Sequence, residues 1–269
     1  MRATAPPAPR LAPRAGVRAA FTGRSHGNVS LLVGDGDALA ARRGLGDLVG
    51  VAADRTVFME QVHGTAVGLA VATDAGRGLT AHADAIAGVD ALVTAEPELA
   101  LVVLTADCVP VLLAGERAVG AAHAGRRGLL DGVVEATVAA LCAMGEQPEH
   151  LVALIGPAVG GCCYELPGNE VDAAAAALPQ VRACTRWGTP SIDLTAGVDA
   201  ALRRAGVRRR AAAEVCTRCG AADWFSHRAA TDRREPQAEP GRQASVIALS
   251  AAEPGADPQG LPPGLHWLA

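Results

Sequence analysis

The chain has 269 residues, enough for one large α/β domain or two small ones. Half of the residues are apolar but only 3 % are aromatic, so the core must be built from aliphatic side chains. The formal charge of −4 argues against a nucleic-acid binder, and the best apolar run, around 99–104, falls far short of the roughly 20 residues that a membrane helix needs. We therefore expect neither nucleic-acid nor membrane partners.

The N-terminal stretch contains four prolines before Arg14 and lacks the continuous apolar segment of a secretory signal. We interpret residues 1–15 as a disordered tail on a cytoplasmic protein. The seven cysteines are odd in number, and the neighbours Cys162 and Cys163 suit no disulfide framework. All 24 basic residues are arginine, which excludes a Schiff-base lysine and the lysine of a Walker loop.

Apolar patterning predicts the following elements in chain order. Short apolar runs rich in β-branched residues predict strands, and apolar residues that recur at spacings of three and four predict helices. The predicted strands are 100–105, 109–114, 118–122, 151–155 and 245–249, and the predicted helices begin near Leu129 and cover 129–144, 171–178 and 194–205.

Two regions look loosely ordered, 229–241 and the tail from Glu253 onward. We find no internal repeat and no convincing linker. The sequence therefore predicts an α/β (mixed α+β) fold with a layered sheet and flanking helices, in a single catalytic domain over 16–250 with a C-terminal tail over 251–269. The oligomeric state is left open between a monomer and a small homo-oligomer.

Three motifs place polar, ligand-type residues at the ends of apolar runs, where active sites of α/β proteins gather. They are Gln61-Val62-His63-Gly64, Thr105-Ala106-Asp107-Cys108-Val109-Pro110 and His123-Ala124-Gly125-Arg126-Arg127-Gly128. Zinc takes imidazole nitrogen and thiolate sulfur, and a catalytic zinc keeps a fourth position open for water. His63, Cys108 and His123 fit that ligand count, although their spacing matches no local motif and leaves a purely structural role open.

Two arginines near these motifs are candidates for binding an anion. Arg127 falls in the first turn of a predicted helix, and Arg24 follows the run Phe21-Thr22-Gly23. We predict that the pair clamps a phosphate, while a solvated surface charge is the alternative for each.

Further motifs complete a resemblance to a known family. They are Ile155-Gly156-Pro157, Cys162-Cys163-Tyr164-Glu165, Cys216-Thr217, Phe225-Ser226-His227-Arg228 and Gly241-Arg242-Gln243. Taken with the first three motifs and in this order, they resemble the laccase-domain family, also called the multicopper polyphenol oxidase or peptidoglycan-editing-factor family, over about 21–249.

The resemblance implies a fold like the catalytic domain of cytotoxic necrotizing factor and a zinc site at His63, Cys108 and His123, with copper as another metal. It also implies phosphorolysis of adenosine, inosine and methylthioadenosine, and adenosine deamination. Purine nucleoside and phosphate are the expected partners. Residues expected to bind substrate are Arg24, Asn28, Gln61, Arg127, Ser226 and Arg228.

The sequence departs from the family pattern in three places. The stretch between Arg24 and Asp35 is short and leaves Asn28 as its polar anchor, Arg126 replaces a usual tryptophan, and 229–240 is long. Each departure could alter substrate preference.

For deamination, a metal-activated water would attack C6 of the purine, with Asp107 carrying a proton or supporting a ligand. A multicopper laccase is disfavoured, because the chain has seven histidines and none in a His-x-His pair. Hydrolysis of a peptidoglycan precursor and non-catalytic binding remain as alternatives.

Three other features carry weaker signals. Cys216 and Cys219 have the spacing of a redox or zinc-knuckle motif, but Cys162 and Cys163 have the wrong spacing for a second ligand pair, so we assign the four no common site. His82 could lie near the metal, and His26 could approach the substrate.

Overall fold

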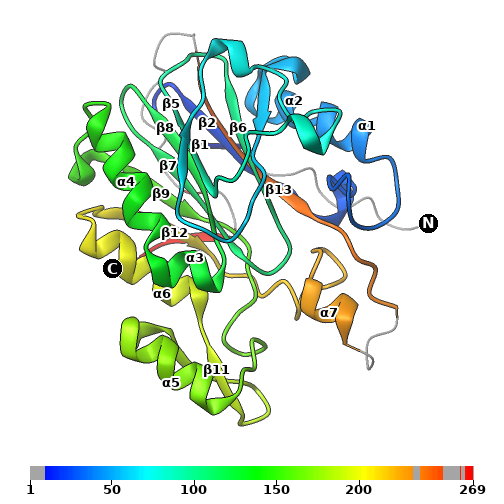
Figure 1. Cartoon of the computed structure of the whole chain (residues 1–269), viewed down its shortest axis with the longest axis vertical. Coiled ribbons are helices and arrows are strands. Elements are labelled where there is room, and N and C mark those ends of the chain that lie inside the picture. Colours follow the sequence, from blue (N-terminus) through cyan, green and yellow to red (C-terminus); the bar gives the residue numbers. More distant parts are fainter. Residues whose placement is uncertain (1–9, 233–236, 251–260, 262–263, 269) are drawn as a thin grey trace.

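The computed structural model describes residues 10–232, 237–250, 261 and 264–268. Two β-sheets stack face to face, and helices cover the outer face of each sheet, so the molecule has four layers (Figure 1). This arrangement confirms the predicted layered α/β fold with flanking helices. The likeness to the catalytic domain of cytotoxic necrotizing factor stays a prediction.

The larger sheet has seven strands in the order β14-β12-β9-β7-β8-β5-β4. Its centre is the antiparallel hairpin of β7 and β8, in which Pro110 pairs with His123. In chain order the strands are β4 (Val67–Leu69), β5 (Ala91–Thr94), β7 (Val109–Ala114), β8 (Val119–Ala124), β9 (Val152–Ile155), β12 (Arg209–Ala213) and β14 (Leu265–Trp267).

The smaller sheet has five strands in the order β1-β2-β13-β6-β3. Its longest strand, β13, pairs antiparallel with both β2 and β6. A strand from near the C-terminus therefore lies at the centre of a sheet that also contains the first two strands of the chain. The strands are β1 (Arg10–Arg14), β2 (Val17–Phe21), β3 (Thr56–Phe58), β6 (Ala100–Thr105) and β13 (Gln243–Leu249).

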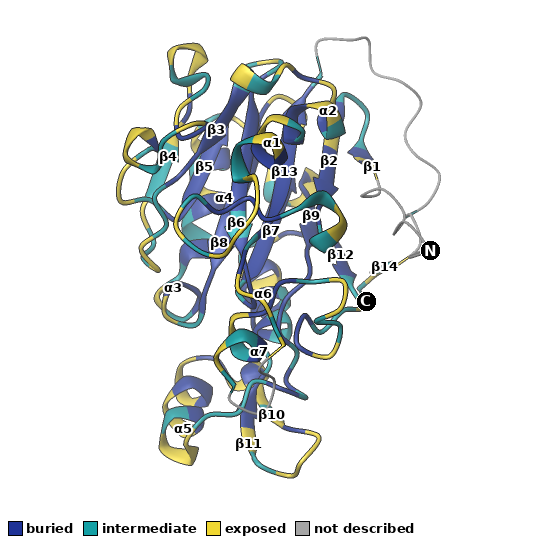
Figure 2. Ribbon diagram, turned by 90° about the vertical axis from the view of Figure 1, so that its right-hand side faces the viewer, coloured by how far each residue is buried: buried dark blue, intermediate teal, exposed yellow. Residues whose placement is uncertain are grey.

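Side chains alternate along each central strand and so divide the core into layers. On β7, Val111 and Leu113 face the helices, whereas Leu112 and Ala114 fill the space between the two sheets. Leu101 and Val103 of β6 meet them from the smaller sheet. Figure 2 shows both sheets buried at the centre, with exposed residues on the surrounding loops and helices. Both faces of these strands are buried, which is why they read as continuous apolar runs in the sequence.

The outer layers consist of short helices. The smaller sheet is covered by α1 (Ala38–Arg43) and α2 (Leu45–Val49), and the larger sheet by α3 (Arg126–Asp131), α4 (Val133–Ala143) and α6 (Leu194–Arg204). A lower lobe holds α5 (Gly168–Ala177) with the strands β10 (Arg182–Cys184) and β11 (Pro190–Ile192), and α7 (His227–Thr231) precedes β13.

The helix predicted from Leu129 is two helices. Gly132 separates α3 from α4 with a φ of 99°, a left-handed conformation that glycine adopts without strain. The apolar spacing of three and four continues across this break, which is why the sequence alone suggests one helix.

Three boundary predictions are wrong in part. The predicted N-terminal tail contains β1, which pairs with β2, and the predicted C-terminal tail contains β14, which pairs with β12. The loose region 229–241 begins inside α7. Hydrogen bonding to a neighbouring strand orders β1 and β14. Residues 1–9, 251–260, 262–263 and 269 of the predicted tails, and 233–236 of the loose region, lie outside the described part. Among the described residues, no helix is long and apolar enough to span a bilayer.

Candidate metal centre

A cavity of about 350 Å³ opens between the end of the smaller sheet and the β7–β8 hairpin. Its volume lies within the range of small-molecule sites, roughly 300–1,000 Å³. One part of the wall is apolar, with Leu32, Phe58, Met59 and Leu104, and another part is polar, with His63, His82, Cys108, His123, His227 and Arg242. The cavity therefore offers an apolar surface beside a cluster of titratable groups.

His63, Cys108 and His123 come together in this cavity, as the sequence predicts. Their ligand atoms all lie within 4.8 Å of one another, and the Cys108 Sγ is 3.8 Å from the His63 Nε2. The two imidazole rings meet edge to face, with centroids 4.7 Å apart. His123 is buried whereas His63 is exposed, so the trio runs from the interior to the cavity mouth.

Backbone conformation aims each of these side chains. His63 follows β3 and has a φ of 61°, a left-handed conformation that costs a non-glycine residue free energy. Asp107 lies in the turn between β6 and β7 and has a φ of 85°. This conformation reverses the chain direction just before Cys108, which lines the cavity. Gly125 must be glycine, because a Cβ there would lie 2.6 Å from the His63 ring and 3.3 Å from the Cys108 Sγ.

The carboxylate of Asp90 connects two of the three ligands. It is fully buried, its Oδ1 lies 2.8 Å from the His123 Nδ1, and its two oxygens accept the backbone N–H groups of Val62, His63 and Gly64 at 2.6–3.1 Å. One side chain therefore orients the His123 ring and holds the strained loop that carries His63. With its Nδ1 engaged by Asp90, His123 directs Nε2 to the cluster.

The charges of the cluster are mutually dependent. Burial raises the pKa of the Cys108 thiol, but the hydrogen bonds and charges of His123 and His63 outweigh it and lower the pKa to about 6. Burial lowers the pKa of His123, but Asp90 and Cys108 outweigh it and raise the pKa to about 9. Burial likewise opposes ionisation of Asp90, yet His123 and the loop N–H groups hold its pKa below the usual value. Without a metal, these opposite shifts favour a Cys108 thiolate beside a His123 imidazolium between about pH 6 and about pH 9.

These residues fit a divalent metal ion of borderline softness. Two imidazole nitrogens and one thiolate converge on one point, a buried carboxylate supports one imidazole from behind, and the exposed side faces the cavity. Three protein ligands and an open side are the pattern of a catalytic rather than a structural site.

Asp107 is placed to support a ligand. Its Oδ1 accepts a hydrogen bond from the Thr217 hydroxyl at 2.6 Å, and its Oδ2 accepts the Arg228 backbone N–H at 2.6 Å. It thereby joins the turn before Cys108 to the loop after β12 and to the first turn of α7. Of the two roles that the sequence suggests for Asp107, this geometry favours support over proton transfer.

Three residues expected to bind substrate have structural hydrogen bonds. Gln61 lines the cavity, but both ends of its amide bond the backbone of Leu104, at 2.7 and 2.9 Å. Asn28 anchors the short loop as expected, since it donates to Val33 and accepts from Ser30 and Arg242. Ser226 caps α7 through Ala229.

The arginines expected to contact substrate lie outside the residues that line the cavity. Arg24 donates to three backbone carbonyls and stacks on Phe225, and Arg127 donates to the carbonyls of Val62 and His63. The Arg228 guanidinium stacks on the Tyr164 ring. Arg126, at the tryptophan position of the family pattern, pairs with Glu170. These contacts brace loops around the site, and phosphate binding by Arg24 and Arg127 stays a prediction.

Sequence reasoning missed four residues of the site. Asp90, directly before an apolar strand, could have been noticed as a charge beside a buried segment. Arg242 and His227 lie in motifs that were recognised without being assigned a role, and both line the cavity, as His82 does. Thr105 also lines it, and its buried hydroxyl has no hydrogen-bond partner in the described residues. His26 instead bonds the Ala41 carbonyl.

The chain is similar to known proteins over most of its length. The sequence profile of the family described as multi-copper polyphenol oxidoreductase laccase matches residues 15–250. The chain is 47 % identical to a purine nucleoside phosphorylase of Streptomyces coelicolor, over 75 % of this chain and 81 % of that protein. It is 42 % identical to a purine nucleoside phosphorylase of Mycobacterium tuberculosis, over 80 % of this chain and 81 % of the other. The crystal structure of YlmD from Geobacillus stearothermophilus superimposes with a TM-score of 0.78 at 32 % identity, covering 89 % of this chain and 94 % of that one.

Replacing Asp90 with asparagine should weaken metal binding by about 10–100-fold, because the neutral amide orients His123 less strongly and loosens the His63 loop. Isothermal titration of the metal-free protein with zinc measures the change. Asp131→Asn, an exposed aspartate on α3, is the matched control and should bind as the wild type does. Equal affinities in the two variants would contradict the role given to Asp90.

Metal affinity should rise with pH. The pKa of Cys108 is about 6 and that of His123 about 9. At a pH between these two values, a metal ion binds a Cys108 side chain that is already a thiolate, but it must displace the proton of His123. The apparent affinity for zinc should therefore increase about tenfold per pH unit from about pH 6.5 to about pH 8.5, with about one proton released per ion. Titrations in buffers of different ionisation enthalpy count the protons. A flat affinity over this range would refute the thiolate–imidazolium pair.

Proposed function

The chain belongs to the laccase-like family of multi-copper polyphenol oxidoreductases, and from this membership and the geometry of its metal centre we propose that it is a zinc-dependent purine nucleoside phosphorylase. Its substrates are adenosine, inosine and methylthioadenosine, and it also deaminates adenosine. The relatives named purine nucleoside phosphorylase support the reaction class.

One observation carries the proposal. Two imidazoles and a thiolate converge on a point in the wall of a cavity sized for a small molecule, with one side open to that cavity. When bound there, zinc supplies a Lewis acid and a means of activating water at neutral pH. Asp90 keeps the His123 and His63 ligands in place without reaching the substrate.

The remaining walls suit a nucleoside and a phosphate. The apolar side chains of Phe58, Met59 and Leu104 can pack against a purine ring, and the partnerless Thr105 hydroxyl can hydrogen-bond a polar group of the substrate. Arg242 lines the same cavity, and its single intramolecular guanidinium bond in the described residues goes to the Gly241 carbonyl. We assign the principal phosphate contact to Arg242, with Arg24 and Arg127 farther from the cavity wall.

Proton transfer falls to the cavity histidines outside the metal trio. Phosphorolysis places a phosphate oxygen on C1′ of the ribose and leaves the base with the bonding electrons, so the purine must gain a proton. His82 and His227 line the cavity and are of the residue type that most often carries protons near neutral pH. The same open site serves deamination of adenosine when phosphate is absent.

Copper-based phenol oxidation is disfavoured by the number of ligands. A multicopper oxidase needs several copper ions in close contact, whereas a single group of two histidines and a cysteine meets at the cavity among the described residues. Hydrolysis of a peptidoglycan precursor uses the same metal centre and is the remaining alternative.

An assay of purified protein tests the proposal. With adenosine, inosine or methylthioadenosine plus phosphate, we expect release of the free base together with ribose 1-phosphate, or 5-methylthioribose 1-phosphate from methylthioadenosine. Chromatography measures the products. Cys108→Ser should abolish the reaction, and Cys184→Ser, at an exposed cysteine of β10, should leave it unchanged. Turnover of a muramyl-serine nucleotide without turnover of nucleosides, or copper-dependent phenol oxidation, would contradict the assignment.

Replacing Arg242 with alanine should raise the KM for phosphate by about 10–100-fold, the loss expected for a hydrogen bond to a charged group, with a smaller change in the KM for the nucleoside. Initial rates at varied phosphate concentration measure it. Arg43→Ala, an exposed arginine of α1, is the control. If Arg127→Ala raises the KM for phosphate and Arg242→Ala does not, phosphate binds at Arg127, as the sequence predicts, and the assignment to Arg242 is wrong.

A further inference from the structure

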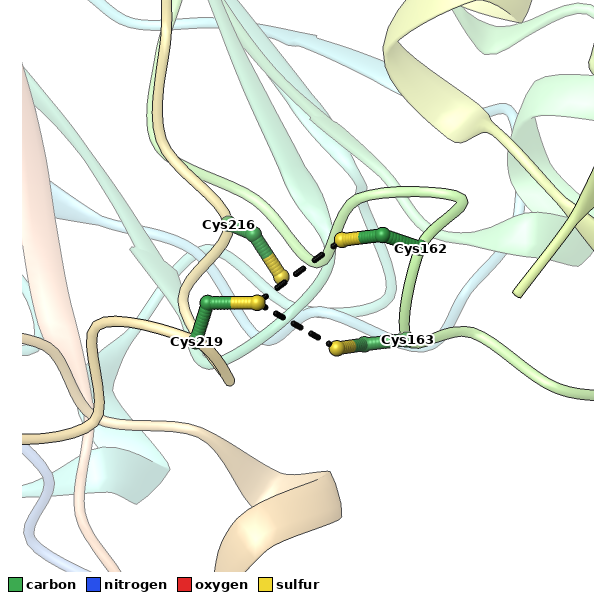
Figure 3. Close-up of side chains that lie close together, drawn as sticks. All are labelled: Cys162, Cys163, Cys216 and Cys219. Carbon is green, nitrogen blue, oxygen red and sulfur yellow. Dashed lines mark hydrogen bonds between the residues drawn. The ribbon is translucent and has the colours of Figure 1, made fainter. Parts of the chain in front are cut away.

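Four cysteines far apart in the chain meet at a second place in the molecule. Cys162 and Cys163 lie in the loop after β9, and Cys216 and Cys219 lie in the loop after β12 (Figure 3). Their sulfur atoms all lie within 4.8 Å of one another, with Cys219 Sγ 3.8 Å from Cys162 Sγ and 3.4 Å from Cys163 Sγ. The expectation that the two pairs share no site is therefore wrong. A turn, rather than the spacing in the sequence, brings the adjacent pair into place.

We propose that these four cysteines bind a structural zinc ion, separate from the one at His63, Cys108 and His123. Zinc–sulfur bonds of about 2.3 Å in a tetrahedron place the sulfurs about 3.8 Å apart. The 3.8 Å between the Cys219 and Cys162 sulfurs equals that edge, and no two of the four sulfurs are more than 4.8 Å apart, which leaves room for one ion rather than a metal–sulfide cluster. Four thiolates also fill the coordination shell, as structural zinc sites require.

The two loops are shaped to deliver the sulfurs. Cys163 and Tyr164 donate backbone N–H bonds to the Gly160 carbonyl, which forms the turn that carries the adjacent cysteines. A Cβ at Gly160 would lie 3.2 Å from the Cys162 Sγ, so only a glycine fits beside the cluster without displacement. In the other loop, Gly220 closes a turn onto the Cys216 carbonyl. The Cys216 sulfur accepts the backbone N–H groups of Cys219 and Gly160, as thiolate ligands commonly do.

The surroundings suit a negatively charged complex. Four thiolates on a divalent ion carry a net charge of −2, and the Arg186 guanidinium lies 3.4 Å from the Cys219 Sγ. The Arg186 backbone N–H also bonds the Cys162 carbonyl. Two disulfides are the rival explanation, but Cys219 contacts both members of the adjacent pair and all four sulfurs face one point, whereas disulfides need two separate directed pairs.

The site would connect two loops that hydrogen-bond Asp107, the residue before Cys108. Next to the cluster, Ala158 pairs with Cys216 and accepts the Thr217 backbone N–H. Thr217 and Val159 in turn bond the side chain and the carbonyl of Asp107, the residue before Cys108. Zinc at the cysteines therefore cross-links the loops that hold Asp107, and its role is structural.

Metal analysis of protein purified without added metal tests the proposal by elemental mass spectrometry. We expect about two zinc ions per chain in the wild type and in Cys184→Ser, and about one in Cys108→Ser and in Cys219→Ser. If the trio binds no metal, the wild type and Cys108→Ser both retain one ion, so failure of the proposed function is distinguished from failure of this inference. Absence of any zinc from Cys108→Ser, or iron in its place, would overturn the inference.

A second measurement does not depend on the folding of Cys219→Ser. Cobalt substituted into Cys108→Ser should give the intense thiolate-to-metal absorption of a four-sulfur site. While zinc is bound, four fewer thiols should react with a thiol reagent than after a chelator has removed the zinc. Thiols that remain missing after chelation and return only on reduction would identify disulfides and overturn the inference.

Discussion

The site depends on a single buried carboxylate. Asp90 accepts three successive backbone N–H groups around His63 and holds the Nδ1 of His123, so it offsets the strain of the His63 loop and sets which nitrogen of His123 faces the metal. A buried carboxylate is stable only when its oxygens are hydrogen-bonded, and here every donor belongs to a ligand or its loop. The contacts that satisfy the buried Asp90 carboxylate are therefore the same contacts that position His63 and His123.

The two-sheet architecture explains why the ligands are far apart in the sequence. His63 follows a strand of the smaller sheet, Cys108 stands where the chain crosses from that sheet to the larger one, and His123 lies near the end of β8. The cavity is lined by residues at the strand ends of both sheets, among them Met59, Thr105 and His123. One of the cysteine loops is linked to the turn before Cys108 by the hydrogen bond from the Thr217 hydroxyl to Asp107. The candidate metal centre and the proposed zinc site of the four cysteines are therefore joined through Asp107, the residue before Cys108.

Much of this could be predicted from the sequence because the central strands are buried on both faces. The runs 100–105 and 109–114 appear as β6 and β7, and polar residues at their ends mark the metal ligands. The short edge strands, such as β1, β4 and β14, could not be predicted, because they form by pairing with a neighbouring strand and their own composition does not indicate a strand. Asp90 and the four-cysteine cluster were missed for a similar reason. Their partners are distant in the chain, so the spacing of Cys216 and Cys219 does not by itself show that Cys162 and Cys163 complete a site.

The central claim is that His63, Cys108 and His123, oriented by Asp90, hold one ion with an open side toward the cavity. A crystal structure of the zinc-loaded protein, with anomalous difference maps on both sides of the zinc absorption edge, tests it most directly. The account predicts a peak about 2.0–2.1 Å from the Nε2 atoms of both histidines and about 2.3 Å from the Cys108 Sγ, facing the cavity. A fully active, zinc-loaded crystal with no peak among these three side chains would contradict it.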